Sequence, residues 1–388
     1  MKHSIDVLLG RAVSAGEVPG VAAMVTSRDK MLYAGAFGKR MLGGDAPMDL
    51  DTVCWLASLT KGLVAVGAMQ LVERGVLDLN QPVQRWLPEL GQARVLEGFD
   101  EEGRPRLRVP KHHITLVHLL THTAGFGYEI WNAEIMKYQQ ATGTPGTGSG
   151  MNALLGTPLL FEPGARWNYG INLDWTGKLI EAVSGQTLGT YLAKNVFAPL
   201  GMDSTGFKIT PAMRARLARM HQRHADGTLE AIEREVRQDA EFESGGGGLY
   251  STASDYLKFL RMMLDKGKAG DTQLLKPETV ALMARNHMGA TRVTRLKAQF
   301  AALSNDAEFF PGVPKSWGLS FQINEAPAPT GRPAGGLMWG GLSNCYYWID
   351  PHTGVGGVYF TQILPFCDVK SLPLYYAFET AVYDALKK

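Results

Sequence analysis

The residues best placed to do chemistry are Ser58 and Lys61, which form a Ser-x-x-Lys tetrad (Ser58-Leu59-Thr60-Lys61) at the start of an apolar run. Positions i and i+3 share one face of a helix, so the Lys61 amine can reach the Ser58 hydroxyl. A serine hydroxyl becomes a good nucleophile only when a base takes its proton, and burial lowers the pKa of a lysine towards that task. The spacing therefore predicts a serine nucleophile with a lysine base.

A second match, Ser27-Arg28-Asp29-Lys30, shows that the tetrad alone is not specific. It lies in a polar turn between two short apolar runs, a pattern typical of a β-hairpin. Outside a helix the two side chains are not forced onto one face, so we interpret Ser27 as structural. The structural alternative for Ser58 is an N-cap serine, which needs no lysine three residues later.

Two further segments contain residues that suit such a site. Tyr169 stands before an expected helix that Asp174 could cap, and its phenol could complete a proton relay with Ser58, although buried tyrosines often only hydrogen-bond in a core. The glycines of segment 335–341 indicate a bulge or a close backbone approach, either to a ligand or to a neighbouring helix.

The elements that position these residues change in kind along the chain. Residues 21–37 predict a β-hairpin, and residues 317–363 predict an antiparallel meander rich in β-branched and aromatic residues. Helical periodicity predicts helices over these ranges: 4–16, 61–73, 116–120, 174–183, 255–265 and 375–386. Two stretches, Thr142 to Gly150 and Glu243 to Gly248, are expected to be glycine-rich loops.

Strands at the two ends of the chain have no partners nearby and should pair with one another. The expected fold class is α/β of the α+β type, an antiparallel sheet flanked by helices. We predict a discontinuous α/β domain of residues 1–55 and 306–388, into which a mostly helical domain of residues 56–305 is inserted. The active site is expected at their interface.

Composition narrows the possible partners. The 388 residues are 45% hydrophobic and 20% charged, with a net charge of +2 and no long basic run, so we expect no nucleic-acid or membrane partner. Three cysteines without CxxC spacing argue against a disulfide framework or a zinc ribbon. The N-terminus lacks a signal-like apolar core, and the longest apolar stretch, 63–69, is too short for a bilayer. We expect a soluble, cytoplasmic protein, with a monomer favoured.

Four histidines, His112, His113, His118 and His122, raise the question of a metal site, since the last two are four residues apart. No acidic or thiolate partner falls at ligand spacing, so we expect no metal and no cofactor. Five aromatic residues are candidates for the lining of an apolar acyl pocket, or simply for a core: Trp55, Phe126, Tyr128, Trp131 and Trp175.

The Ser-x-x-Lys tetrad, Tyr169 and the glycine-rich segment follow one another along the chain. In this order they resemble the motifs of the superfamily of serine β-lactamases and penicillin-binding proteins, on the class C side. Within it the chain is most similar to the family VIII carboxylesterases and to the fungal acyltransferase of the statin precursor monacolin J. The resemblance covers nearly the whole chain and is carried by these stretches: Trp55-Leu56-Ala57-Ser58-Leu59-Thr60-Lys61, Glu97-Gly98-Phe99-Asp100, His118-Leu119-Leu120-Thr121-His122-Thr123-Ala124-Gly125, Tyr169-Gly170-Ile171-Asn172-Leu173-Asp174 and Trp339-Gly340-Gly341.

The resemblance implies a role for each matching residue. Ser58 would be the acylated nucleophile, and Lys61 and Tyr169 the shared proton relay. The backbone N–H groups of Ser58 and Leu342 would form the oxyanion hole. It also implies that His118 and His122 are structural residues beneath the active-site floor.

The chain departs from the β-lactamases at two places in the expected substrate-binding set, which comprises Trp339, Gly340, Gly341, Ile171 and Asn172. Trp339 replaces the lysine of a Lys-Thr-Gly-like triplet, and Ile171 replaces an asparagine, with Asn172 one position late. Apolar side chains suit an uncharged ester better than an anionic amide.

We therefore predict a serine carboxylesterase that hydrolyses short-chain neutral esters through an acyl-enzyme on Ser58, with a small-molecule ester as its partner. One alternative is an acyltransferase on the same scaffold, in which an alcohol replaces water. Others are a hydrolase like a β-lactamase or DD-peptidase, and a non-catalytic binding protein, against which the intact Ser58, Lys61 and Tyr169 argue.

Overall fold

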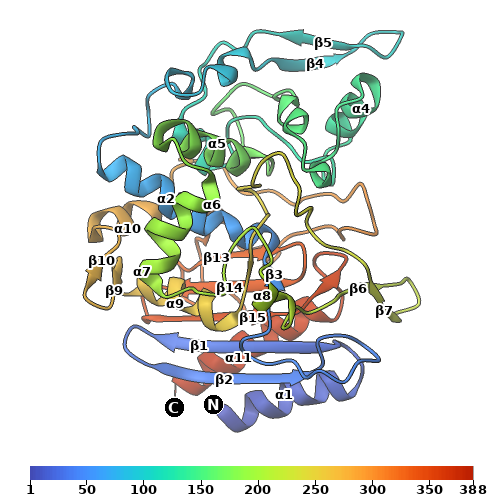
Figure 1. The fold of residues 1–388 in the computed structure, drawn as a ribbon, viewed down its shortest axis with the longest axis vertical. Helices are drawn as coiled ribbons and strands as arrows, with labels where there is room; N and C mark the ends of the chain where they lie inside the picture. The colour runs from blue at the N-terminus through green and yellow to red at the C-terminus, as the bar shows by residue number, and fades with distance from the viewer. Residues whose placement is uncertain (388) are drawn as a thin grey trace.

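A seven-stranded antiparallel sheet occupies the lower half of the molecule as drawn in Figure 1, in the computed structural model, which describes residues 1–387. The strand order is β11-β12-β13-β14-β15-β1-β2. Strand β1 pairs with β15 so that Ala22 lies opposite Phe360, which joins the N-terminal hairpin to the C-terminal meander as predicted. The strands are β1 (Gly20–Ser27), β2 (Met31–Gly38), β11 (Lys315–Trp317), β12 (Gln322–Asn324), β13 (Leu337–Gly341), β14 (Cys345–Asp350) and β15 (Val355–Phe360).

Helices cover both faces of this sheet. On β14 the Tyr347 ring lies 5.5 Å from Tyr256 of α9 (Ala253–Leu264), whereas the Trp348 ring lies 5.6 Å from Phe378 of α11 (Ser371–Leu386). Successive residues of a strand point to opposite faces, so α9 and α11 lie on opposite sides. Helix α1 (Lys2–Ser14) packs beside α11 and buries Ile5, which leaves β14 and β15 wholly buried. This confirms the predicted fold class.

The middle of the chain forms a second group of elements around α2 (Thr60–Glu73). Every residue of α2 from Thr60 to Leu71 is buried, as expected for a helix surrounded by other elements. The further helices are α3 (Leu116–Leu120), α4 (Ala133–Thr142), α5 (Asn172–Ser184), α6 (Leu188–Leu192), α7 (Ala198–Leu200), α8 (Pro211–Arg214) and α10 (Pro277–Met283).

Within residues 1–387 the remaining short strands form three pairs and one three-stranded sheet. They are β3 (Cys54–Trp55) with β8 (Tyr250–Ser251), β4 (Val95–Phe99) with β5 (Pro105–Arg108), β9 (Lys268–Ala269) with β10 (Thr272–Gln273), and β6 (Met220–Arg223) between β7 (Leu229–Ile232) and β16 (Ile363–Leu364). Because β16 lies late in the chain and β6 in its middle, this small sheet connects the two groups of elements. The domain boundaries at residues 55/56 and 305/306 stay a prediction.

One predicted strand differs from the structure. The apolar run from Trp317 to Ile323 is not a single strand, because a turn separates β11 from β12. Gly318 N–H donates to the Phe321 carbonyl at 2.8 Å, and Ser320 adopts a positive φ of 78°. The two halves of the run thus pair antiparallel with each other, with Trp317 opposite Gln322.

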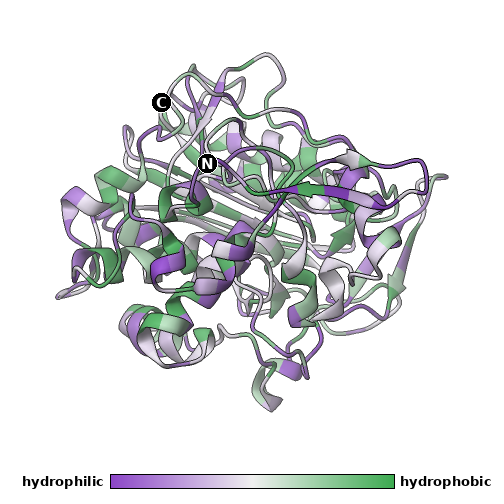
Figure 2. Cartoon of the chain, turned by 90° about the horizontal axis from the view of Figure 1, so that it is seen from above, coloured by the Kyte–Doolittle hydropathy of each residue, from purple (hydrophilic) through white to green (hydrophobic). Residues whose placement is uncertain are grey.

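Seen from above, the central strands are mostly hydrophobic and the hydrophilic segments lie mainly on the outer helices and loops (Figure 2). Among residues 1–387, no helix combines the length and the apolar character needed to cross a bilayer.

Candidate active site

Ser58 lies in a sharp turn between strand β3 and helix α2. The turn comprises Ala57–Leu59, and Ala57 adopts a left-handed conformation with φ of 46°, which is uncommon for a residue with a Cβ. The preceding Trp55 is held from two sides, because its carbonyl accepts the Ser343 hydroxyl at 2.7 Å and its indole donates to the Gly247 carbonyl at 2.7 Å. This anchoring fixes where the Ser58 side chain points.

Lys61 is one turn further on and lies in contact with the Ser58 hydroxyl. Its Nζ is 3.1 Å from Ser58 Oγ, 3.2 Å from Tyr128 Oη and 2.6 Å from the Gly246 carbonyl. The side chain is only 1% exposed, and this burial lowers the pKa of Lys61 to about 7, against an opposing effect of the Asp174 carboxylate. Near neutral pH the amine can therefore lose a proton and accept one from Ser58.

The charge that opposes deprotonation of Lys61 comes from a buried acid at the start of α5. Asp174 accepts hydrogen bonds from Ser244 Oγ at 2.6 Å and from the Gly246 N–H at 3.0 Å, and burial raises its pKa. Contrary to the sequence analysis, Asp174 does not cap the helix, which begins two residues earlier at Asn172. A Cβ on Gly246 would lie 2.4 Å from Asp174 Oδ2, so this contact requires glycine.

Tyr169 also lies beside the Lys61 amine. Lys61 Nζ is 4.6 Å from the centroid of the Tyr169 ring, and the Trp339 indole N–H donates to Tyr169 Oη at 2.8 Å. Burial raises the pKa of Tyr169 well above its usual value, although the Ser58 hydroxyl and the Trp339 indole oppose this shift. The phenol thus stays protonated at neutral pH, where Lys61 is the group that titrates.

Strand β13 brings Leu342 to the nucleophile. A Cβ on Gly341 would lie 2.2 Å from the Leu56 carbonyl oxygen, so only glycine lets the strand approach this closely. Leu342 and Ser58 line the same cavity, and within residues 1–387 the Leu342 N–H donates to no backbone carbonyl. Its N–H is therefore free to bind a developing oxyanion.

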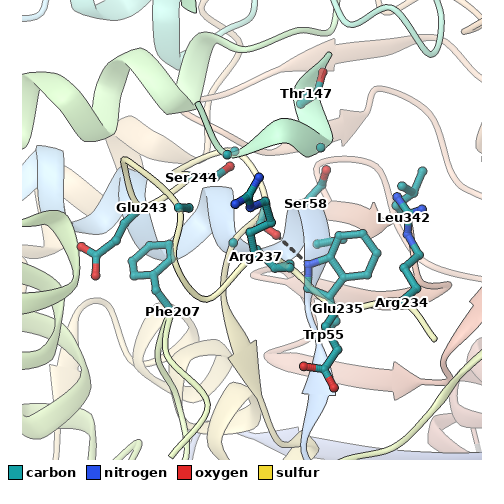
Figure 3. A pocket seen from close by; sticks show the side chains of 18 of the residues that line it. Trp55, Ser58, Thr147, Phe207, Arg234, Glu235, Arg237, Glu243, Ser244 and Leu342 are labelled. Carbon is teal, nitrogen blue, oxygen red and sulfur yellow. Dashed lines mark hydrogen bonds between the residues drawn. The ribbon is translucent and has the colours of Figure 1, made fainter. Parts of the chain in front are cut away.

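The cavity above Ser58 has a volume of about 370 Å³, and its wall combines aromatic and charged side chains (Figure 3). Of the five predicted aromatic residues, Trp55, Tyr128 and Trp131 line it, whereas Phe126 and Trp175 line a separate cavity. Both predicted glycine-rich loops border it, through Thr147 to Gly150 and Glu243 to Gly248. The remaining lining includes Ile130, Phe207, Phe242 and Leu342, with charged residues from segment 233–237.

The residues predicted to bind substrate are close to the relay but lie outside the cavity lining. Trp339 is 3% exposed, and its indole contacts Tyr169 rather than open space. Ile171 is buried, and the Asn172 amide lies 2.9 Å from His122 Nδ1. Their role in binding substrate, with that of Gly340 and Gly341, stays a prediction.

The histidines are held by local contacts. His118 Nδ1 accepts the Thr115 N–H at 3.2 Å in a reciprocal cap of α3, and His122 packs 4.6 Å from the Tyr169 ring. Across residues 1–387 no three His, Cys, Asp or Glu side chains are grouped so that they could hold a metal ion.

Sequence reasoning missed how three residues act together here. Tyr128 was considered only as a pocket aromatic and Asp174 only as a cap, yet both contact the surroundings of Lys61, and Gly246 contributes its carbonyl. Two features of the sequence could have indicated these contacts. They are the acid between Leu173 and Trp175 near the start of a helix, and the run of four glycines, 245–248.

The motifs and this geometry agree with known proteins. The profile described as Beta-lactamase matches residues 6–379. The chain belongs to the β-lactamase family. Monacolin J acid methylbutanoyltransferase of Aspergillus terreus is 36% identical over 398 aligned residues, which cover 98% of this chain and 95% of that protein. Lovastatin esterase of Penicillium rubens is 32% identical over 379 residues, covering 93% of each.

Solved structures of the β-lactamase family agree as well. Simvastatin synthase from A. terreus, in a mutant form named LovD6, has a TM-score of 0.87 at 34% identity and covers 99% of this chain and 94% of its own. These likenesses confirm the resemblance drawn from the motifs. They identify the protein as an enzyme of the serine hydrolase and acyltransferase type.

Proposed function

We propose that this protein is a serine acyltransferase, which moves a short acyl group from an ester to an alcohol through an acyl-enzyme on Ser58. The comparisons support this alternative better than the esterase that the sequence analysis put first, because the relative at 36% identity is named a methylbutanoyltransferase. Hydrolysis is then the competing reaction, in keeping with the relative that is named an esterase.

The observation that carries the proposal is the 3.1 Å contact between a buried Lys61 amine and the Ser58 hydroxyl at the base of the cavity. In acylation Ser58 Oγ bonds to the ester carbonyl carbon while its proton passes to Lys61. The C–O bond to the leaving alcohol then breaks, and that alcohol takes the proton. In deacylation the acceptor alcohol attacks the acyl carbon, its proton passes through Lys61, and Ser58 regains its hydroxyl.

Two further groups complete the proposed mechanism. Tyr169, protonated and beside both Ser58 and Lys61, donates a hydrogen bond to the oxygen that gains charge as the leaving group departs. The N–H groups of Ser58 and Leu342 bind the oxyanion of the tetrahedral intermediate. The reaction needs only these side chains and backbone groups, together with a small-molecule ester and an alcohol.

A β-lactamase or peptidase function is the second candidate, and the side chain at one position argues against it. In this chain the residue at the position of the lactamase lysine, Trp339, is buried and hydrogen-bonded to Tyr169. A substrate carboxylate finds no cation at that position.

The test is to supply the purified protein with nitrophenyl butyrate and a series of alcohols, and to measure butyrate against the butyryl ester of each alcohol. With at least one alcohol we expect the amount of butyryl ester formed to exceed the amount of free butyrate. The same alcohol should speed the release of nitrophenol if deacylation limits the rate. Ser58→Ala serves as the control for uncatalysed transfer. If no alcohol changes either the products or the rate, the protein is an esterase and the transferase proposal fails.

A further inference from the structure

The cavity above Ser58 contains a cation with no carboxylate partner. Arg234 lines the cavity, and its guanidinium carbon lies 5.8 Å from the centroid of the Trp55 ring. No ion pair or hydrogen bond forms to its side chain anywhere in residues 1–387, although the chain is otherwise rich in paired arginines. A partly buried guanidinium without an ion-pair partner is an unusual arrangement in a folded protein.

Neighbouring acids are turned to other partners. Exposure alternates along segment 233–237, so that Glu233 and Glu235 are exposed while Arg234 is partly buried. Glu233 pairs with Arg219, and Glu235 pairs with Arg214. In Figure 3 the Glu235 carboxylate points away from Ser58, whereas the Arg234 side chain extends towards Leu342.

The backbone beside Arg234 is fixed. The Val236 N–H donates to the Tyr250 hydroxyl at 2.9 Å, and Tyr250 belongs to β8, which pairs with the Cys54–Trp55 strand leading to Ser58. The backbone that carries Arg234 is therefore tied to the strand that leads to the nucleophile. The planar fork of the guanidinium suits a carboxylate, which it can bind through two parallel N–H···O bonds, and the apolar wall of Trp55 strengthens such a pair by excluding water.

We propose that Arg234 binds a carboxylate of the substrate and so selects anionic substrates for the Ser58 site. This inference rests on the proposed acyl transfer at Ser58. The carboxylate belongs either to the acyl donor or to the acceptor alcohol, both of which must enter the same cavity. A carboxylate on a flexible chain can reach Arg234 while its ester carbonyl lies at Ser58.

The experiment compares each carboxylate with its methyl ester, in two arms. The donor arm uses mono-nitrophenyl glutarate against its methyl ester. The acceptor arm uses hydroxyhexanoate against methyl hydroxyhexanoate, with nitrophenyl butyrate as donor. In each arm the readout is the ratio of kcat/KM for the anionic over the neutral probe, so a general loss of activity cancels.

In at least one arm we expect the ratio to fall about tenfold or more in Arg234→Gln, the size of a lost charge-assisted hydrogen bond. Arg234→Lys keeps the charge without the fork and should lose less of the ratio. Arg237→Gln is the matched control, since Arg237 lines the same cavity but is paired with Asp239. Its ratio should stay close to that of the wild type.

Two outcomes overturn the inference. The ratios in both arms could be unchanged by Arg234→Gln, or Arg237→Gln could lower them equally, which would show a general positive field instead of a binding residue. Labelling of Ser58 by a fluorophosphonate separates this failure from that of the proposed function. A wild-type protein that is labelled and transfers the butyryl group to methyl hydroxyhexanoate retains the proposed function even if Arg234 proves irrelevant.

Discussion

The indole N–H of Trp339 donates a 2.8 Å hydrogen bond to the phenolic oxygen of Tyr169. In the β-lactamases that this family is named for, a lysine of a Lys-Thr-Gly-like triplet occupies the position of Trp339. Here the residue contacts the proposed proton relay: the indole hydrogen bond opposes the rise that burial causes in the pKa of Tyr169, and the side chain presents no cation to a substrate.

Removing this donor tests its contribution. In Trp339→Phe the ring remains but the N–H is lost, so Tyr169 loses a partner worth about 0.5–1.5 kcal/mol, or roughly two- to twelvefold in rate. We expect kcat/KM on nitrophenyl butyrate to fall by that factor. Trp317→Phe is the control, because Trp317 packs 4.7 Å from Trp339 but its indole N–H has no partner within residues 1–387. Equal losses in both variants would show a packing effect alone.

The nucleophile can be assigned by comparing the two Ser-x-x-Lys tetrads. Ser58→Ala should lower the rate by several orders of magnitude, because the nucleophile and its base act as a unit. Ser27→Ala should keep nearly full activity, since Ser27 Oγ makes only turn hydrogen bonds, accepting from the Asp29 and Lys30 N–H groups and donating to the Lys30 carbonyl. Mass spectrometry of the protein trapped with a fluorophosphonate checks the site directly. Modification at any residue other than Ser58 contradicts the assignment.

The pH profile should report the proton on Lys61. Because its folded-state pKa is about 7, kcat/KM should rise with pH through a midpoint near 7 and then level off. Asp174 raises that pKa, so Asp174→Asn should move the midpoint to lower pH. Asp255→Asn is the control, as Asp255 is also buried but pairs with Lys258 on α9. A profile that is flat from about pH 5 to 9 would rule out Lys61 as the base.

Neutral esters should be preferred over β-lactams. A cephalosporin carries a carboxylate on the ring system beside its reacting amide, and Trp339, at the position of the lactamase lysine, offers that carboxylate no charge. The missing contact typically amounts to about 1.5–3 kcal/mol, or more for an unmatched buried carboxylate. We expect kcat/KM on nitrophenyl butyrate to exceed that on a chromogenic cephalosporin by at least about a hundredfold. Similar efficiencies on both would favour a β-lactamase.

Local sequence patterns were sufficient for most elements. The helix from Leu116 to Leu120 and the hairpin of β1 and β2 agree with the structure because periodicity and turn residues are short-range signals. The turn at Ser320 was missed, because its left-handed residue is not a glycine and the apolar residues around it continue a strand-like pattern. Pairing of β1 with β15 followed from the lack of local partners.

The candidate site could be predicted from the sequence only where the residues that contact one another lie in one segment. Ser58 and Lys61 are three residues apart and their contact follows from helical geometry, whereas Lys61 also contacts Tyr128 and Gly246, which lie 67 and 185 residues away. Trp339 was expected to face substrate, since its hydrogen bond to a residue 170 positions earlier is a product of tertiary packing. The surroundings of Arg234 could not be predicted for the same reason, since they come from separate segments of the chain.

The register of β1 against β15 constrains the order in which the protein can be built. During synthesis β1 emerges with its hairpin partner β2 long before residues 355–360 exist, so the edge that later meets β15 remains unpaired until almost the whole chain has left the ribosome. An unpaired apolar edge is a template for association with other chains. The β1 edge of the nascent hairpin is therefore open to such association until β15 is made.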